Sequence, residues 1–158
     1  MLYLVVKFLH LIGAAVLLGA GTGIAFFMLL AHRDGRPVVV AGVLRIVVIA
    51  DFLFTATTVV VQPITGVWLA LAAGYDLLDG WIVTSILLYL LTGAFWLPVV
   101  WMQMRLRDLA DAAVATGTPL PDAYRRLFRW WFASGFPAFA AVLAIFWLMI
   151  SRPSFQLV

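Results

Sequence analysis

The sequence predicts an all-α fold, a bundle of four transmembrane helices with both termini outside. Composition is the first observation, because 66% of the 158 residues are hydrophobic and only 11% are charged. A soluble domain has roughly a quarter charged residues and about half apolar ones, so the solvent of this chain is lipid. The second observation is four apolar segments, each long enough for the roughly 20 residues that cross a bilayer. The third is the position of the arginines, which sets the orientation.

The first two segments cover residues 2–31 and 38–73. The first is longer than the roughly 7–15 apolar residues of a signal-peptide core, so we expect a retained span. The second is longer than one upright helix requires at about 1.5 Å per residue. It also contains Pro63, and we expect a bend there because proline removes a backbone donor.

The last two segments cover residues 81–104 and 127–150. The stretch RLRDLADAAVA after the third segment is expected to continue that helix into water. The prolines of TGTPLPD should end it, because proline disfavours helix at the residue before it. Pro121 and Asp122 are expected to begin the last helix, with the carboxylate near the positive end of the helix dipole. No repeat or linker divides the chain, so we expect residues 1–158 to form one membrane domain.

The arginines predict which connections are cytoplasmic. Arg33, Arg36 and Arg45 lie in or near the first connection, whereas the second contains only acidic charges, Asp76 and Asp79. The third connection region contains Arg105, Arg107, Arg125, Arg126 and Arg129. Cytoplasmic loops are rich in arginine and lysine, so the first and third connections are expected inside and both termini outside. This placement explains the net charge of +3 without nucleic acid as a partner.

Polar residues recur at helical spacing and form stripes that should face the bundle interior. By depth they divide into an outer cluster and an inner cluster. The outer cluster contains Lys7, His10, Gln62, Thr65, Ser85 and Tyr89. The inner cluster contains Asp51, Thr55, Gln103, Arg129 and Ser134. A further stripe of small residues, Ala15, Gly19 and Gly23, is of the kind that lets helices pack closely.

His10 is the central candidate of the outer cluster, because ionisable groups within a membrane are costly and usually functional. It could be an axial haem ligand, a metal ligand or a proton relay, or simply donate a hydrogen bond between helices. The chain has no cysteine, and no ligand cluster surrounds His10, which argues against a classical zinc or copper site. Haem needs only one or two axial ligands and a wide apolar slot.

Other residues around His10 suit a flat ligand. Lys7, one turn away, could snorkel to the surface or pair with a carboxylate of the ligand. Trp68 and Trp81 flank the outer cluster and could wall a flat ring. The methionines lie at other depths, so we expect a five-coordinate haem or a second ligand from another chain.

Three further expectations concern the remaining polar groups. His32 is expected to be a solvated loop residue. Asp51 is expected to pair with an arginine, either Arg45 or Arg129. No nucleophile and base of the Ser/His/Asp kind can be recognised, so catalytic residues stay unknown.

The segments KFLH and AHR resemble the two ends of the first span in HemJ-type protoporphyrinogen oxidases. ITGVWLAL resembles their second span, GWIVTSILLYLL the third and RLFRWWFASGFPAFAAVLAIFWLMISRP the last. The whole sequence is also similar to a bacterial family of predicted integral membrane proteins, domain of unknown function 2269. Copper-resistance CopD-like proteins share the layout. The resemblance implies a multi-pass protein of the bacterial inner membrane.

HemJ-type proteins are four-helix b-haem membrane proteins, and their first-span histidine is implicated in haem binding. That role would fall to His10, because the K-x-L-H motif is intact. Ser85 stands where the family has a lysine, and Phe95 and Trp96 stand where it has histidines. These departures argue against protoporphyrinogen oxidase activity, whereas the haem-binding role that the resemblance implies for His10 is kept.

The main hypothesis is a haem b protein that transfers electrons or oxidises a membrane-soluble substrate. His10 would bind the iron, Lys7 would pair with a propionate, and Gln62, Thr65 and Tyr89 would line the pocket. The alternative is a non-enzymatic membrane protein, either a permease for copper or another small solute or an assembly partner. An enzyme acting on a lipid or tetrapyrrole without haem is a third reading. Besides the lipid bilayer, a second copy of the chain and a redox partner are the partners left open.

Overall fold

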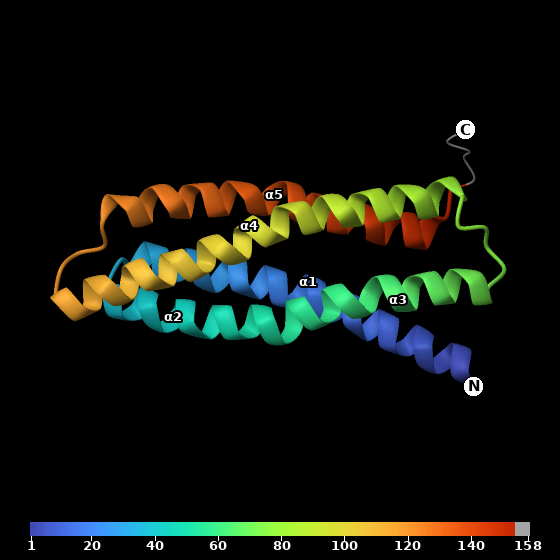
Figure 1. Ribbon diagram of the computed structural model, residues 1–158, viewed down its shortest axis with the longest axis horizontal. Coiled ribbons are helices and arrows are strands. Elements are labelled where there is room, and N and C mark those ends of the chain that lie inside the picture. The colour runs from blue at the N-terminus through green and yellow to red at the C-terminus, as the bar shows by residue number, and fades with distance from the viewer. Residues whose placement is uncertain (154–158) are drawn as a thin grey trace.

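The computed structural model describes residues 1–153 and is helical throughout, with no strand in that range. The helices are α1 (Leu2–Asp34), α2 (Pro37–Ala50), the π-helix η1 (Asp51–Ala56), α3 (Thr57–Ala72), α4 (Gly80–Thr116) and α5 (Asp122–Ser151). Since α2, η1 and α3 follow one another without a break, the chain makes four rods (Figure 1). All four are long and apolar enough to cross a membrane. The predicted all-α transmembrane fold is therefore confirmed.

The ends of the helices follow from local sequence. Gly35 and Gly117 end α1 and α4 in the left-handed conformation, with φ of 74° and 64°, which glycine adopts without a steric penalty. Pro37 occupies the first turn of α2. Proline is tolerated there because the N–H groups of the first turn have no acceptor within the helix. The helices run beyond the expected apolar segments, most of all α4, which continues to Thr116. That extension is the one expected to project into water.

The second rod becomes irregular at η1, six residues of wider π-helix, in addition to the proline at position 63. Pro63 lies inside α3 and has no N–H, so it leaves the carbonyl of Val59 without its usual helical donor. The Tyr89 hydroxyl of α4 donates to that carbonyl. The proline therefore creates an acceptor on α3, and α4 supplies the donor for it.

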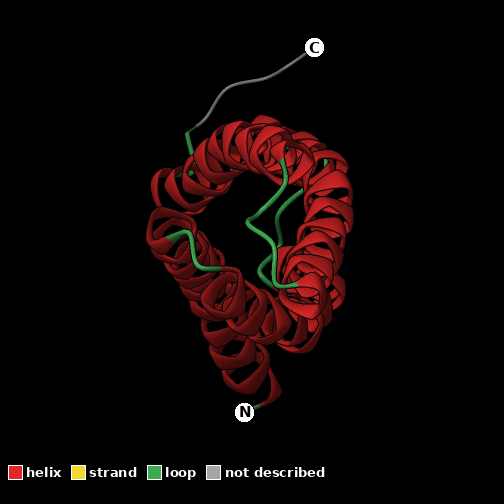
Figure 2. Cartoon of the chain, turned by 90° about the vertical axis from the view of Figure 1, so that its left-hand side faces the viewer, coloured by secondary structure: helices red, strands yellow, loops and turns green. Residues whose placement is uncertain are grey.

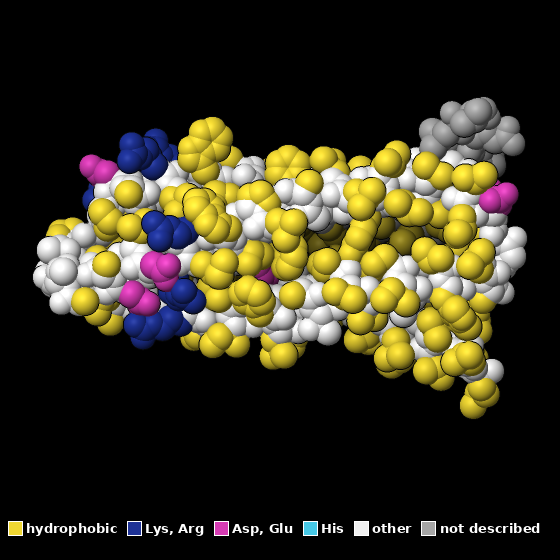
Figure 3. Space-filling model, in the orientation of Figure 1, with side chains coloured by type: hydrophobic (Ala, Val, Ile, Leu, Met, Phe, Trp, Pro, Cys, Tyr) yellow, Lys and Arg dark blue, Asp and Glu magenta, His cyan; other side chains and the backbone are white. Residues whose placement is uncertain are grey.

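The four rods surround a common axis when viewed from one end (Figure 2). We call the end with residues 35–36 and 117–121 the basic end, and the end with residues 1 and 73–79 the terminal end. In the view of Figure 3, the Lys and Arg side chains gather at the basic end. The two sides of the membrane are not distinguished by the fold alone, so the orientation stays a prediction.

The apolar core occupies the half of the bundle near the basic end, where α2 packs against α1 and α4. Its buried members are Ile24, Met28, Ala31, Val40, Ala41, Leu44, Val47, Met102, Leu106, Ala110, Ala113, Leu120, Tyr124, Phe128 and Trp131. None of them comes from α3 or from the first two-thirds of α1. Tight apolar packing therefore belongs to one half of the molecule.

The half near the terminal end is packed differently. There α3 packs against α1, and α4 packs against α5, but the surface is hollowed between the two pairs (Figure 3). Its buried side chains include the polar groups of His10, Thr58, Gln62 and Ser85. This half therefore combines a hollowed surface with buried polar side chains.

Candidate functional site

His10 lies at the contact between α1 and α3, with 9% of its surface exposed. Its Nδ1 is 2.8 Å from Oγ1 of Thr65. The Thr65 hydroxyl donates its single hydrogen to backbone carbonyls of its own helix, at 2.8 Å to Val61 and 3.2 Å to Gln62. With the Thr65 hydrogen on these carbonyls, Thr65 accepts from His10. This assignment of the hydrogen bonds places the imidazole proton on Nδ1 and a lone pair on Nε2.

Gln62 fixes the backbone at the same point. Its Nε2 donates to the carbonyl oxygen of His10 at 2.9 Å, and the amide is buried. Gln62 and Thr65, one turn apart on α3, thus hold the backbone and the ring of one residue. Both residues therefore contact His10 directly and position it.

Two glycines allow α1 and α3 to approach at this site. A Cβ added to Gly66 would lie 3.2 Å from Cε1 of His10, closer than such contacts normally are. A Cβ added to Gly13 would overlap the amide of Gln62. These glycines were not predicted as site residues, although Gly66 directly follows Thr65 in the sequence.

Nε2 of His10 has no hydrogen-bond partner within residues 1–153. Nε2 does not occur among the fully buried polar atoms without partners, so part of it reaches the surface of the protein. No group of three or more potential metal ligands occurs in the described part of the chain. The site can therefore supply one imidazole nitrogen with fixed orientation, which is the donor set of a single axial bond.

The other predicted pocket residues, Tyr89, Trp68 and Trp81, make separate contacts in the half near the terminal end. Tyr89 reaches from α4 to α3 through its bond to Val59. Trp68 packs against Tyr3, with ring centroids 6.4 Å apart, and Trp81 packs edge-on against Tyr75 at 5.3 Å. Both tryptophans therefore stand at the terminal end of the bundle in aromatic pairs.

Lys7 lies one turn before His10 on α1 and is exposed. It forms no ion pair with any residue in the range 1–153. Its ammonium group is therefore free of any carboxylate in the described part of the chain.

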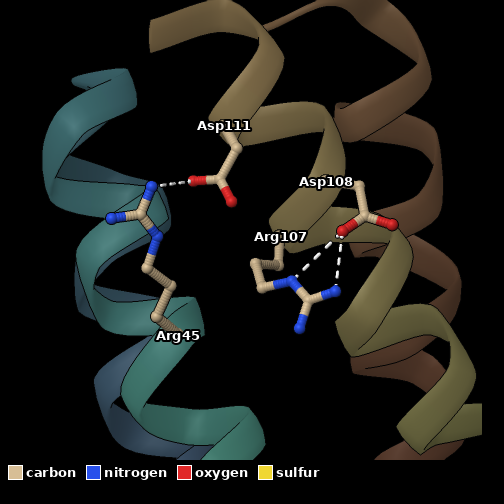
Figure 4. A network of polar contacts seen from close by, with 4 residues as sticks. All are labelled: Arg45, Arg107, Asp108 and Asp111. Atoms are coloured by element: carbon tan, nitrogen blue, oxygen red, sulfur yellow. Dashed lines mark hydrogen bonds and ion pairs between the residues drawn. The ribbon is translucent and has the colours of Figure 1, made fainter. Parts of the chain in front are cut away.

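The inner cluster differs from the prediction. Asp51 is only 3% exposed and its Oδ1 accepts from Nε1 of Trp96 at 3.3 Å. The prediction that Asp51 pairs with Arg45 is wrong, because Arg45 pairs with Asp111 at 2.7 Å (Figure 4). Arg129 is exposed and forms no ion pair within the described residues. Oδ2 of Asp51, Oγ1 of Thr55 and Oε1 of Gln103 are buried without partners in that range.

Two further expectations are corrected. His32 belongs to α1 and is no solvated loop residue, because its ring stacks on Phe128 with centroids 3.7 Å apart and planes 6° apart. The small-residue stripe of α1 does not pack within the described chain, since nothing lies within 4 Å of a Cβ added to Gly19. The helix instead uses the face of His10, Gly13 and Ile24.

Four apolar rods with polar side chains turned inward define a polytopic α-helical membrane protein. More particularly, the chain belongs to the family described as predicted integral membrane protein (DUF2269), whose model matches residues 4–153. The chain matches no curated protein and no solved structure.

Proposed function

We propose that the protein binds one haem b through Nε2 of His10. The observation that supports this proposal is that the two imidazole nitrogens have different roles. Nδ1 donates to Thr65, and Nε2 has no partner among the described residues. Histidines that bind metals commonly donate their other ring N–H in this way, which fixes the ring and raises the basicity of the ligand nitrogen. When bound, haem would supply reversible electron transfer.

The shape of the bundle supports the same proposal. The apolar core fills only the half near the basic end, and the other half is hollowed between α3 and α4 (Figure 3). A flat apolar ring would restore packing there. Lys7 would pair with a propionate near the surface, and Tyr89, Trp68 and Trp81 would contact the edges of the ring.

The second axial position would be open or filled by another chain. Met28 and Met102 are buried in the core near the basic end, so neither is a candidate for the site of His10. The exposed face of Gly19 on the same helix leaves room for a second copy. Both arrangements give the five-coordinate or shared haem expected for a bundle with one suitable histidine.

The resemblance to HemJ-type proteins adds to this proposal, because it implies the same role for the first-span histidine. It does not extend to protoporphyrinogen oxidation, since Ser85, Phe95 and Trp96 replace the family's third-span residues. We therefore assign electron transfer, or oxidation of a membrane-soluble substrate, as the activity. The compartment would be the bacterial inner membrane, with a redox partner to accept or donate the electron.

An absorption spectrum tests the proposal directly. Protein purified in detergent from haem-supplemented cells should show a Soret band that shifts on addition of dithionite. The band should be lost in His10→Ala and kept in His32→Ala, which removes the chain's other histidine. Size-exclusion elution of both variants at the wild-type volume would show that they are folded.

Two results would overturn the haem proposal. One is colourless wild-type protein that also fails to bind added haemin, and the other is a Soret band unchanged in His10→Ala. Colourless, folded protein would favour the alternative, a non-enzymatic permease or assembly partner in which the bond between His10 and Thr65 only joins two helices.

A further inference from the structure

The arginines at the basic end fall into two groups. Four of them form ion pairs with aspartates: Arg36 with Asp34, Arg45 with Asp111, Arg107 with Asp108, and Arg125 with Asp122. Arg33, Arg105, Arg126 and Arg129 form no ion pair with any residue in the range 1–153. This second group has positive charge that the described protein does not neutralise.

Three arginines of this second group, Arg105, Arg126 and Arg129, line two hollows on α4 and α5. Arg126, Arg129 and Trp130 surround a hollow of about 410 Å³. An adjoining hollow of about 340 Å³ is lined by Trp101, Arg105, Leu109, Ala123, Arg126, Leu127 and Trp130. Arg126 and Trp130 line both hollows, and we call the two hollows together the α4–α5 groove.

The groove combines cationic and apolar walls at a membrane boundary. Trp101 and Trp130 are 54% and 68% exposed, and exposed tryptophans of transmembrane helices concentrate at the level of the headgroups. Leu109 and Leu127 provide apolar lining beside the arginines. No aspartate lines either hollow.

We propose that the α4–α5 groove binds the headgroup of an anionic phospholipid. Guanidinium groups match phosphate oxygens with two parallel hydrogen bonds, and basic pockets between transmembrane helices are established sites for acidic lipids. The apolar half of the lining contacts the upper part of the acyl chains. It is this apolar half, together with the two tryptophans, that selects a lipid over free phosphate.

The three arginines have complementary places in the groove. Arg126 and Arg129 are three residues apart and therefore lie on the same face of α5. Arg105, on α4, lines the second hollow together with Arg126. Charge from two helices on one phosphate would also fasten α4 to α5 near the water-facing end of the pair.

The test compares lipids on purified protein in detergent. Wild-type protein is titrated with phosphatidylglycerol or phosphatidylcholine, with the midpoint of thermal unfolding and lipid retention in native mass spectrometry as readouts. Phosphatidylglycerol should raise the midpoint and be retained at least tenfold better than phosphatidylcholine. The double variant R126Q/R129Q should lose this preference.

The matched control is R36Q/R45Q, which removes the same net charge from arginines that are already paired. It should keep the preference for phosphatidylglycerol. The proposal would be overturned if wild-type protein responded equally to the two lipids. It would also be overturned if R36Q/R45Q lost the preference for phosphatidylglycerol as fully as R126Q/R129Q. Stabilisation of the same size by inorganic phosphate alone would show that the acyl chains play no part, and would overturn the choice of a lipid.

Discussion

The imidazole of His10 and the hydroxyl of Thr65 join α1 to α3 through a hydrogen bond of 2.8 Å between Nδ1 and Oγ1. The direction of this bond follows from Thr65, whose own hydrogen is used on its helix backbone. This contact between two polar side chains therefore assigns the proton of His10 to Nδ1 and leaves Nε2 as the basic nitrogen. That relationship links helix packing to the proposed ligand chemistry.

Thr65→Val should weaken the site while preserving its volume. It removes the acceptor of the Nδ1 proton, so the ring loses its fixed orientation. If His10 binds haem, affinity should fall about 10–100-fold, as for other groups that orient a metal ligand. Titration of the apoprotein with haemin measures this change.

Thr57→Val is the matched control for that variant. The Thr57 hydroxyl is exposed and bonds only to the Leu53 carbonyl of the same rod. Haemin affinity equal to wild type is expected there. An equal loss of affinity in both variants would contradict the orienting role of Thr65.

Gly13→Ala should destabilise the protein because the added methyl group overlaps the buried amide of Gln62. Overpacking of this kind typically destabilises by about 1–3 kcal/mol. Gly19→Ala adds the same methyl where no atom of residues 1–153 lies within 4 Å, and alanine is the better helix former. Thermal unfolding in detergent should therefore show a lower midpoint for the first variant and an unchanged or higher one for the second.

Tyr89→Phe and Pro63→Ala should couple through the Val59 carbonyl. Tyr89→Phe leaves that carbonyl without its donor, at a loss of about 1 kcal/mol in membrane proteins. Pro63→Ala restores a backbone N–H one turn away, which can bond the same carbonyl. The double variant should be more stable than the sum of the single effects predicts, as a double-mutant cycle would measure. Simple additivity would contradict the assignment.

Helical periodicity predicted the polar faces well, because side chains three and four residues apart share a face whatever their partners are. Asp51, Thr55, Thr58 and Gln62 are all buried, as are Ser85 and Gln103. Periodicity could not predict the partners. Whether Arg45 meets Asp51 or Asp111 depends on the register between α2 and α4, and the π-helix at Asp51–Ala56 changes that register locally.

The depth of a residue along its helix predicted burial less well than the face of the helix on which the residue lies. Arg129 and Asp51 were grouped by depth alone, yet Arg129 is exposed and Asp51 is buried. His32 was assigned to a loop because polar residues surround it, but its stack on Phe128 depends on an approach of α1 to α5 that no local pattern shows. The site around His10 was predicted in part because its partners lie on two regular stripes.

Asp51→Asn should leave the stability unchanged or increase it. Asparagine keeps an oxygen acceptor for the Trp96 indole and removes the carboxylate, whose Oδ2 is buried without a partner among the described residues. Asp51→Leu removes the acceptor as well and leaves a buried indole N–H, which costs about 1–3 kcal/mol. Thermal unfolding in detergent should show a higher midpoint for Asp51→Asn than for Asp51→Leu. The reverse order would show that Asp51 is stabilised by an interaction other than the bond to Trp96.

Labelling of single cysteines should find Thr118 on the cytoplasmic side and Leu78 on the opposite side. The chain contains no cysteine, so Thr118→Cys and Leu78→Cys each introduce one target, in connections where both residues are exposed. Arg105, Arg126 and Arg129 lie at the end of the bundle that holds Thr118, and arginine-rich connections stay on the cytoplasmic side. A membrane-impermeant maleimide applied to intact spheroplasts should therefore label residue 78 and spare residue 118 until the membrane is opened. The opposite pattern would invert the chain, and would move both the mouth of the His10 site and the α4–α5 groove to the other face of the membrane.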